Sequence, residues 1–78
     1  MNNQWSAGAQ QATREAIEEQ TFGIRGEKVY FKHIDGTFGL MAAADLIAGH
    51  YVVHDPMGEQ IASFESIDAL LNAGWILD

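Results

Sequence analysis

Two stretches of this sequence, residues 30–53 and 51–77, follow the same plan. Each begins with Tyr-x-x-His, passes a glycine in a predicted turn and an apolar stretch, and becomes extended again after a second glycine. The matched pairs are Tyr30 and Tyr51, His33 and His54, Gly36 and Gly58, and Gly49 and Gly74. Repetition at about 20 to 50 residues is typical of a supersecondary unit that buries its apolar face against a neighbouring copy. We therefore expect an internal duplication of a strand–strand–helix unit; because the identities are few, chance similarity is the alternative.

The first unit predicts a hairpin and a short helix. Residues 29–34 are dense in β-branched and aromatic side chains, and Asp35-Gly36 favours a tight turn into a second strand over residues 37–41. Residues 42–48 then predict a short helix that stops at Gly49 in left-handed geometry. The apolar side chains expected on the buried face here are Leu40, Ala43, Ala44 and Ile47.

The second unit carries the clearest local signal. Asp55-Pro56-Met57-Gly58 has the residue preferences of a type I turn, with Gly58 able to take positive φ and form a bulge. Strands are expected over residues 50–55 and 59–64, then a helix capped by Ser66 and stopped by Gly74, then a closing strand or a buried plug over residues 75–77. The side chains expected to be most buried are Ile61, Ile67, Leu70, Leu71 and Trp75.

A separate helix is expected at the start of the chain. Ser6 is a suitable N-cap for a helix that runs to about Gln20. We therefore divide the chain into an N-terminal helical extension, residues 1–24, and a small α+β domain, residues 25–78. The expected fold is this helix followed by two β-hairpin-plus-short-helix units, in which a mainly antiparallel sheet is covered by helices on one face.

Charge and composition exclude several classes of function. The net charge is −7, and residues 29–78 carry seven acidic side chains against Lys32 alone. Nucleic-acid affinity depends on clustered lysine and arginine, so we expect no nucleic-acid partner. No apolar run approaches the roughly 18 to 20 residues that span a bilayer, and neither cysteine nor a recognisable leader is present. We expect a cytoplasmic protein that does not enter membranes.

Three histidines are weak candidates for a metal site. His50, His54 and Asp55 are close in sequence, and His33 is the counterpart of His54 in the other unit. Imidazole and carboxylate bind zinc or copper, but on a strand His50 and His54 lie about 13 Å apart at about 3.3 Å per residue. Only His33 opposite one of them would complete a site. The alternative is that His33 and His54 precede their turns and donate to backbone carbonyls, so we assign no metal ligand.

No catalytic residue or cofactor is predicted. Ser63 and Ser66 carry hydroxyl groups that a histidine could activate as nucleophiles for hydrolysis. However, Ser66 is already explained as a helix cap, and no Gly-x-Ser-x-Gly segment occurs. The glycines fall at turns and helix ends and form no phosphate-binding loop.

The remaining features favour a protein that binds another protein. Tyrosine is frequent at binding hot spots, which makes Tyr30 and Tyr51 candidates, and Asp45, Glu59 and Glu65 offer negative charge to a basic partner. We expect a small acidic, non-catalytic binding module, such as a regulator, an immunity-type protein or an inhibitor, with a homodimer also possible. The alternatives are a histidine-based metal or small-molecule binding protein and a homo-oligomeric enzyme with an intersubunit site. The acidity is also compatible with a role in solubility alone.

Overall fold

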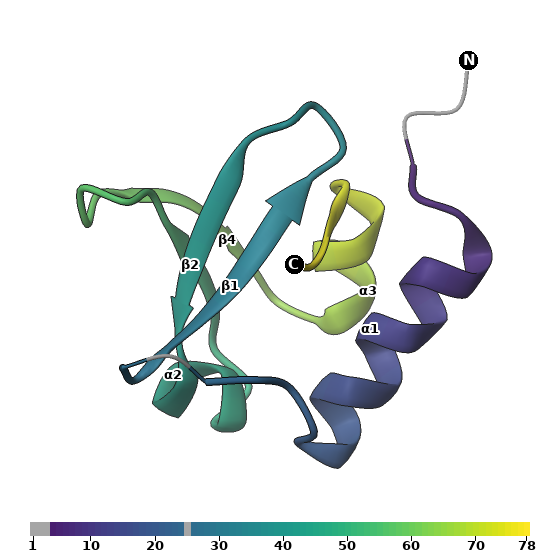
Figure 1. Ribbon diagram of the computed structural model, residues 1–78, viewed down its shortest axis with the longest axis horizontal. Helices are drawn as coiled ribbons and strands as arrows, with labels where there is room; N and C mark the ends of the chain where they lie inside the picture. The colour runs from purple at the N-terminus through teal and green to yellow at the C-terminus, as the bar shows by residue number, and fades with distance from the viewer. Residues whose placement is uncertain (1–3, 25) are drawn as a thin grey trace.

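The chain folds as a helix followed by a curled antiparallel sheet whose strands are joined by turns and two short helices (Figure 1). The computed structural model describes residues 4–24 and 26–78. The elements in chain order are α1 (Ala7–Glu19), β1 (Lys28–His33), β2 (Phe38–Ala42), α2 (Ala43–Ile47), β3 (Tyr51–His54), β4 (Gln60–Phe64), α3 (Ile67–Asn72) and β5 (Trp75–Leu77). This is the α+β fold that the sequence predicts.

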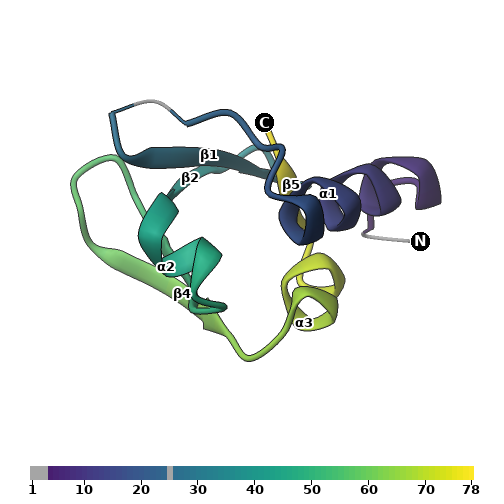
Figure 2. The same ribbon diagram turned by 90° about the horizontal axis from the view of Figure 1, so that it is seen from below.

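The sheet has the strand order β4-β3-β2-β1-β5, so the last strand closes next to the first. Strand β5 pairs antiparallel with β1, with His33 opposite Trp75 and Phe31 opposite Leu77. Strand β4 pairs with β3 and lies at the other edge. Seen from below, α2 lies on the inner side of the curl, between β1–β2 and β4 (Figure 2).

Both hairpin turns have the same backbone hydrogen bonds. In the first, Gly36 N–H donates to His33 C=O (2.9 Å) and His33 N–H to Thr37 C=O (2.7 Å). The second turn repeats this pattern over residues 55–59, and the glycines Gly36 and Gly58 have φ of 96° and 91°. A type I turn followed by a left-handed glycine is one of the common hairpin connections.

The two short helices also end alike. Gly49 and Gly74 follow α2 and α3 with φ of 84° and 101°, the left-handed geometry that the repeat predicts. After α2, Gly49 N–H donates to Leu46 C=O (3.2 Å) and His50 N–H to Asp45 C=O (2.8 Å). These two bonds satisfy carbonyls that the helix itself leaves unpaired.

The core lies between the inner face of the sheet and the short helices. Its fully buried side chains are Val29, Phe31, Met41, Val53 and Leu70. The prediction for Ile61 is wrong, because this side chain is 43% exposed. A bulge shifts the β3–β4 register, so that Val53 pairs with Ala62 and Ile61 becomes the additional residue on β4.

The predicted buried face of the 42–48 helix is also wrong in part. Strand β2 continues to Ala42, so Leu40 belongs to the sheet, where strand alternation places it on the outer side opposite Tyr30. The inward residues of α2 are Ala43 and Leu46, whereas Ala44 is exposed and Ile47 is 52% exposed.

Helix α1 is fixed at both ends by local hydrogen bonds and packs against β5. The Ser6 hydroxyl oxygen accepts from Ala9 N–H (3.2 Å), and Gln20 ends the helix in left-handed geometry. Thr13 Oγ1 accepts from Leu77 N–H (3.2 Å), and Arg14 forms an ion pair with Asp68 of α3. In the described part of the chain, no helix combines the length and apolar character needed to cross a membrane.

Candidate functional site

Acidic side chains are excluded from the sheet. Of the eleven aspartates and glutamates of the sequence, ten lie on a helix, a turn or a connecting segment, Asp78 follows β5, and the five strands contain none. The strands therefore provide a surface without negative charge, with carboxylates at its periphery. This distribution resembles the apolar centre and polar rim of a protein interface.

The outer face of the sheet exposes several of these apolar side chains. On β1 and β2, Tyr30 lies opposite Leu40 and Lys32 opposite Phe38, and Leu40 lies in turn opposite His54 of β3. Since directly opposed residues share a face, these side chains stand on the same side of the sheet. The exposed fractions are 41% for Tyr30 and 55% for Phe38.

Part of this face is covered by residues that precede α1. Trp5 Nε1–H donates to Gly74 C=O (2.8 Å), and Lys32 Nζ lies 5.4 Å from the centre of the Trp5 ring. The cation–π contact holds Lys32 at the β5 side of the sheet. Tyr30 and Phe38 remain exposed beside it.

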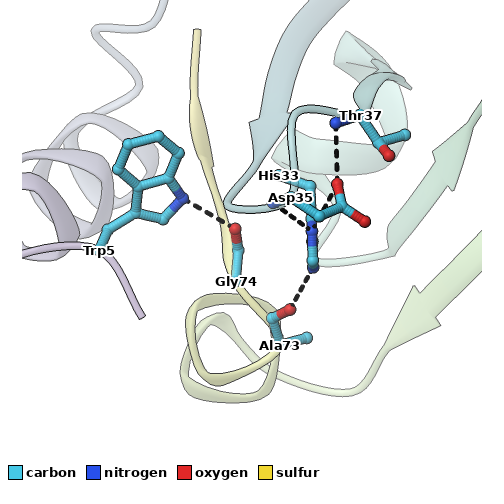
Figure 3. A network of polar contacts seen from close by, with 6 residues as sticks. All are labelled: Trp5, His33, Asp35, Thr37, Ala73 and Gly74. Atoms are coloured by element: carbon cyan, nitrogen blue, oxygen red, sulfur yellow. Dashed lines mark hydrogen bonds and ion pairs between the residues drawn. The ribbon is translucent and has the colours of Figure 1, made fainter. Parts of the chain in front are cut away.

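His33 links the first hairpin turn to the end of α3 (Figure 3). Its Nε2 lies 2.6 Å from Ala73 C=O, and because a carbonyl only accepts, Nε2 carries the hydrogen. Its Nδ1 lies 3.2 Å from Asp35 N and 3.0 Å from Asp35 Oδ1. The ring also packs edge-on against Trp75, with centroids 4.9 Å apart. Both ring nitrogens thus have partners within the protein, as expected for a histidine that joins two segments.

Asp35 is the charged group of this network. Its Oδ1 accepts from Thr37 N–H (2.8 Å). The pKa of Asp35 is lowered, first by the hydrogen bond from the Thr37 side chain, then by that from the Thr37 backbone, and further by His33. These bonds favour the ionised carboxylate, which stabilises the turn between β1 and β2.

The three histidines do not come together. His33 points to the inner side, opposite Trp75, and His54 to the outer side, opposite Leu40, while β2 lies between their strands. His50 is exposed in the segment between α2 and β3. Within residues 4–24 and 26–78, no group of three or more histidine, cysteine, aspartate or glutamate side chains could hold a metal ion. The histidine-based metal alternative therefore gains no support from the geometry.

Small hollows occur beside two of the predicted residues. One of about 290 Å³ lies between the end of α1 and β1, where Phe22 and Tyr30 contribute to its wall. Another of about 190 Å³ is lined by Lys28, Leu40 and His54 together with part of the second turn. Lys28, His54 and Asp55 all line the second hollow, and Asp55 Oδ1 accepts from Met57 N–H and Glu59 N–H, so this carboxylate is engaged by the turn.

The predicted partner-binding residues separate into three groups. Tyr30 lies on the outer face, whereas Tyr51 packs against the core and Asp45 is half-buried in the first turn of α2. Glu59 and Glu65 are both exposed, and they immediately precede and follow β4. The structure therefore brings Glu59 and Glu65 to the two ends of one strand.

Sequence reasoning missed Phe38 as a candidate. Phe38 lies on the outer face with Tyr30 and is the more exposed of the two aromatic side chains. The strand register places it opposite Lys32. The turn around Gly36 sets that register, so its residue preferences were the available signal.

Comparisons with protein-family models, with curated proteins and with solved structures find no significant match to this chain.

Proposed function

We propose that this chain is a small, acidic, non-catalytic module that binds another protein through the outer face of its sheet. The observation that carries the proposal is the pair of exposed aromatic side chains on that face, Tyr30 at 41% and Phe38 at 55% exposed. Aromatic side chains supply a large contact area and are enriched among residues that dominate binding energy. A regulator, an immunity-type protein or an inhibitor works in this way, and the cytoplasm is the compartment we propose for it.

The charge distribution favours a basic partner. The acidic residues lie around the strands, so a partner that covers Tyr30 and Phe38 brings its rim towards carboxylates at the turns and connections. Complementary charge at a rim chiefly raises the association rate and selects the partner. Glu59 and Glu65 are the members of the predicted acidic set that border the sheet, because they flank β4.

Affinity capture with variants of the outer face tests this proposal. The bait is the whole chain, used as wild type, as Tyr30→Ser with Phe38→Ser, and as Met57→Ser. Met57 is a matched control, because it is apolar and 89% exposed but lies in the turn between β3 and β4. We expect a bound protein from the source cells to be retained by wild type and Met57→Ser and lost by the double variant, while circular dichroism shows that all three are folded.

Two results would contradict or redirect the proposal. Equal retention of every bound protein by the three baits would show that the outer face binds nothing. Light scattering that detects a concentration-dependent dimer of the wild type, abolished by the double variant, would identify the partner as a second copy of this chain.

A further inference from the structure

We propose that β4 is a docking edge, to which an extended segment of a partner adds as a further strand, with a basic residue at each end of that segment. This inference rests on the proposed function, that the protein binds another protein. It adds the part of the sheet that is used and the chemistry of the segment that it accepts. Strand addition of this kind obtains affinity from backbone hydrogen bonds and specificity from alternating side chains.

The two edges of the sheet differ in how they are covered. At the β5 edge, α1 packs against the strand, and Thr13 Oγ1 accepts the hydrogen bond from Leu77 N–H at 3.2 Å. At the β4 edge, the strand pairs with β3 alone within the described chain. The side chains of Gln60, Ile61 and Ser63 on β4 are exposed. An edge strand left in this state presents unpaired backbone groups to another chain.

The sequence of β4 contains neither lysine nor proline, two residues that protect many edge strands. Proteins commonly place lysine or proline on an open edge to prevent pairing with other chains. Strand β4 reads Gln-Ile-Ala-Ser-Phe, without a charged residue or proline. Its bulge lies at the Gln60 end, so the remainder, from Ala62 to Phe64, pairs regularly with β3 and presents a regular edge.

The negative charges at the two ends of β4 determine which kind of strand can pair with this edge. Glu59 and Glu65 are exposed, and their side chains form no hydrogen bond or ion pair with residues that the structure describes. A second copy paired antiparallel about Ala62 would place Glu59 of one copy opposite Glu65 of the other, at both ends of the pair. Like charges directly opposed across strands are destabilising, so self-pairing is disfavoured.

A basic segment satisfies both glutamates. Glu59 and Glu65 are six positions apart, and the bulge at Ile61 lies between them. Lysine or arginine five or six residues apart on an added strand would therefore lie near both. Between them, every second side chain of the added strand would stand on the outer side next to Ile61, which is 43% exposed. The segment that fits therefore alternates apolar and polar residues between two cations.

A designed peptide provides the direct test. The probe is acetyl-Lys-Thr-Val-Thr-Val-Thr-Lys-amide, whose valines share a face with its lysines and so stand on the outer side with Ile61. Its matched control has glutamate in place of both lysines. In a titration of the labelled whole chain followed by NMR, we expect the lysine peptide to shift the amide signals of residues 60–64 and to slow their hydrogen exchange. The glutamate peptide should bind at least about tenfold more weakly.

Two variants locate the binding, and one serves as control. Glu59→Lys with Glu65→Lys reverses only exposed charges and should weaken lysine-peptide binding at least about tenfold. Glu18→Lys with Glu19→Lys reverses two exposed charges on α1, away from β4, and should not. Ser63→Pro places a residue without an N–H group on the edge and should abolish binding, provided that its NMR spectrum shows a folded protein.

The outcomes separate this inference from the proposed function. Peptide shifts confined to Tyr30, Phe38 and their neighbours, unaffected by Ser63→Pro, would overturn the edge inference and leave the proposed function standing. Equal binding of both peptides, or no saturable binding of either, would also overturn it. Binding at β4 together with capture unaffected by the outer-face variants would retain the edge and refute the role of the aromatic face.

Discussion

Two glycines of this chain are required for different reasons. At one, only the backbone conformation favours glycine, whereas at the other neighbouring side chains also leave no room for a Cβ. Gly49 and Gly74 occupy equivalent positions after α2 and α3, with φ of 84° and 101°. An added Cβ at Gly49 would meet nothing within 4 Å, whereas at Gly74 it would lie 2.9 Å from both His33 Nε2 and Ile34 Cγ2. The residue that ends α3 is therefore also where the first hairpin contacts it.

We predict that Gly49→Ala and Gly74→Ala destabilise to different extents. Gly49→Ala should lower the free energy of unfolding by about 1 kcal/mol, because alanine is strained at positive φ. Gly74→Ala should cost more, since it adds a steric clash with the His33 ring to the same strain. Urea unfolding of the two variants beside the wild type measures both values. Equal losses would mean that the hairpin moves away from α3 without cost.

The lowered pKa of Asp35 predicts a specific dependence of stability on pH. In an unfolded chain aspartate has a pKa of about 3.9, and in the folded protein the hydrogen bonds of Thr37 lower the pKa of Asp35 below its ordinary value. The stabilisation is therefore present above about pH 4 and is lost as the pH falls through the lower, folded value. Asp35→Asn should be less stable than wild type at pH 7, and the difference should shrink in acid. A difference of the same size at both pH values, measured by urea unfolding, would contradict this assignment.

At the scale of elements, the two short helices contribute to the core through different residues. Leu70 of α3 is fully buried, and Ile47, at the end of α2, is 52% exposed. Leu70→Ala should cost about 2 to 5 kcal/mol, a large part of the stability of a domain of this size, because it leaves a cavity. Ile47→Ala, which removes a similar volume from the surface, should cost less than about 1 kcal/mol. Thermal unfolding compares the two, and similar melting temperatures would mean that α3 is not essential to the core.

Helix caps and turns could be predicted from the sequence because the residues that determine them are close together in the chain. Ser6 and Ser66 cap helices as predicted, accepting from Ala9 N–H and Ala69 N–H. The type I turn and positive φ of Gly58 also follow from the residues of that turn. In each case the residues that determine the conformation lie within four positions of one another.

The pairing of strands that are distant in the sequence could not be predicted in the same way. The internal repeat suggests that the strand after each helix has an equivalent place, yet β3 pairs with β2 of the preceding hairpin, and β5 pairs with β1 instead of β4. The error for Ile61 has the same origin, because one bulge in the β3–β4 register decides which side chain turns outward. Register is a property of two segments, and a single segment does not contain it.

At the scale of the whole molecule, the fold determines which of the predicted binding residues lie near one another on the surface. The sequence indicated negative charge and tyrosines as candidate contacts, but only the tertiary structure places Tyr30 beside Phe38 and brings Glu59 and Glu65 to the ends of β4. Tyr51, by contrast, is partly buried and packs against the core. The candidate site therefore depends on the strand order, which no local motif predicts.

The final prediction tests whether charge guides a partner to this molecule. With a partner obtained by capture, substituting Asp45→Asn, Glu59→Gln and Glu65→Gln together should slow association and flatten its dependence on salt, because screened long-range attraction is lost. The structure divides this effect among the three residues. Glu59 and Glu65 are exposed beside β4, whereas Asp45 is half-buried in α2, so Glu59→Gln with Glu65→Gln should reproduce most of it and Asp45→Asn little.

Association rate constants are measured by stopped flow from low to high salt. They show whether the acidic side chains attract the partner or only keep the protein soluble. The three substitutions lie outside the capping hydrogen bonds of Ser6 and Ser66 and should leave the unfolding temperature nearly unchanged, so a change in rate reports on charge. Rate constants that do not respond to the triple substitution at any salt concentration would assign the negative charge to solubility alone. Binding would then depend on the apolar contact, and Phe38, the more exposed aromatic of the outer face, would be the residue whose truncation raises the dissociation rate most.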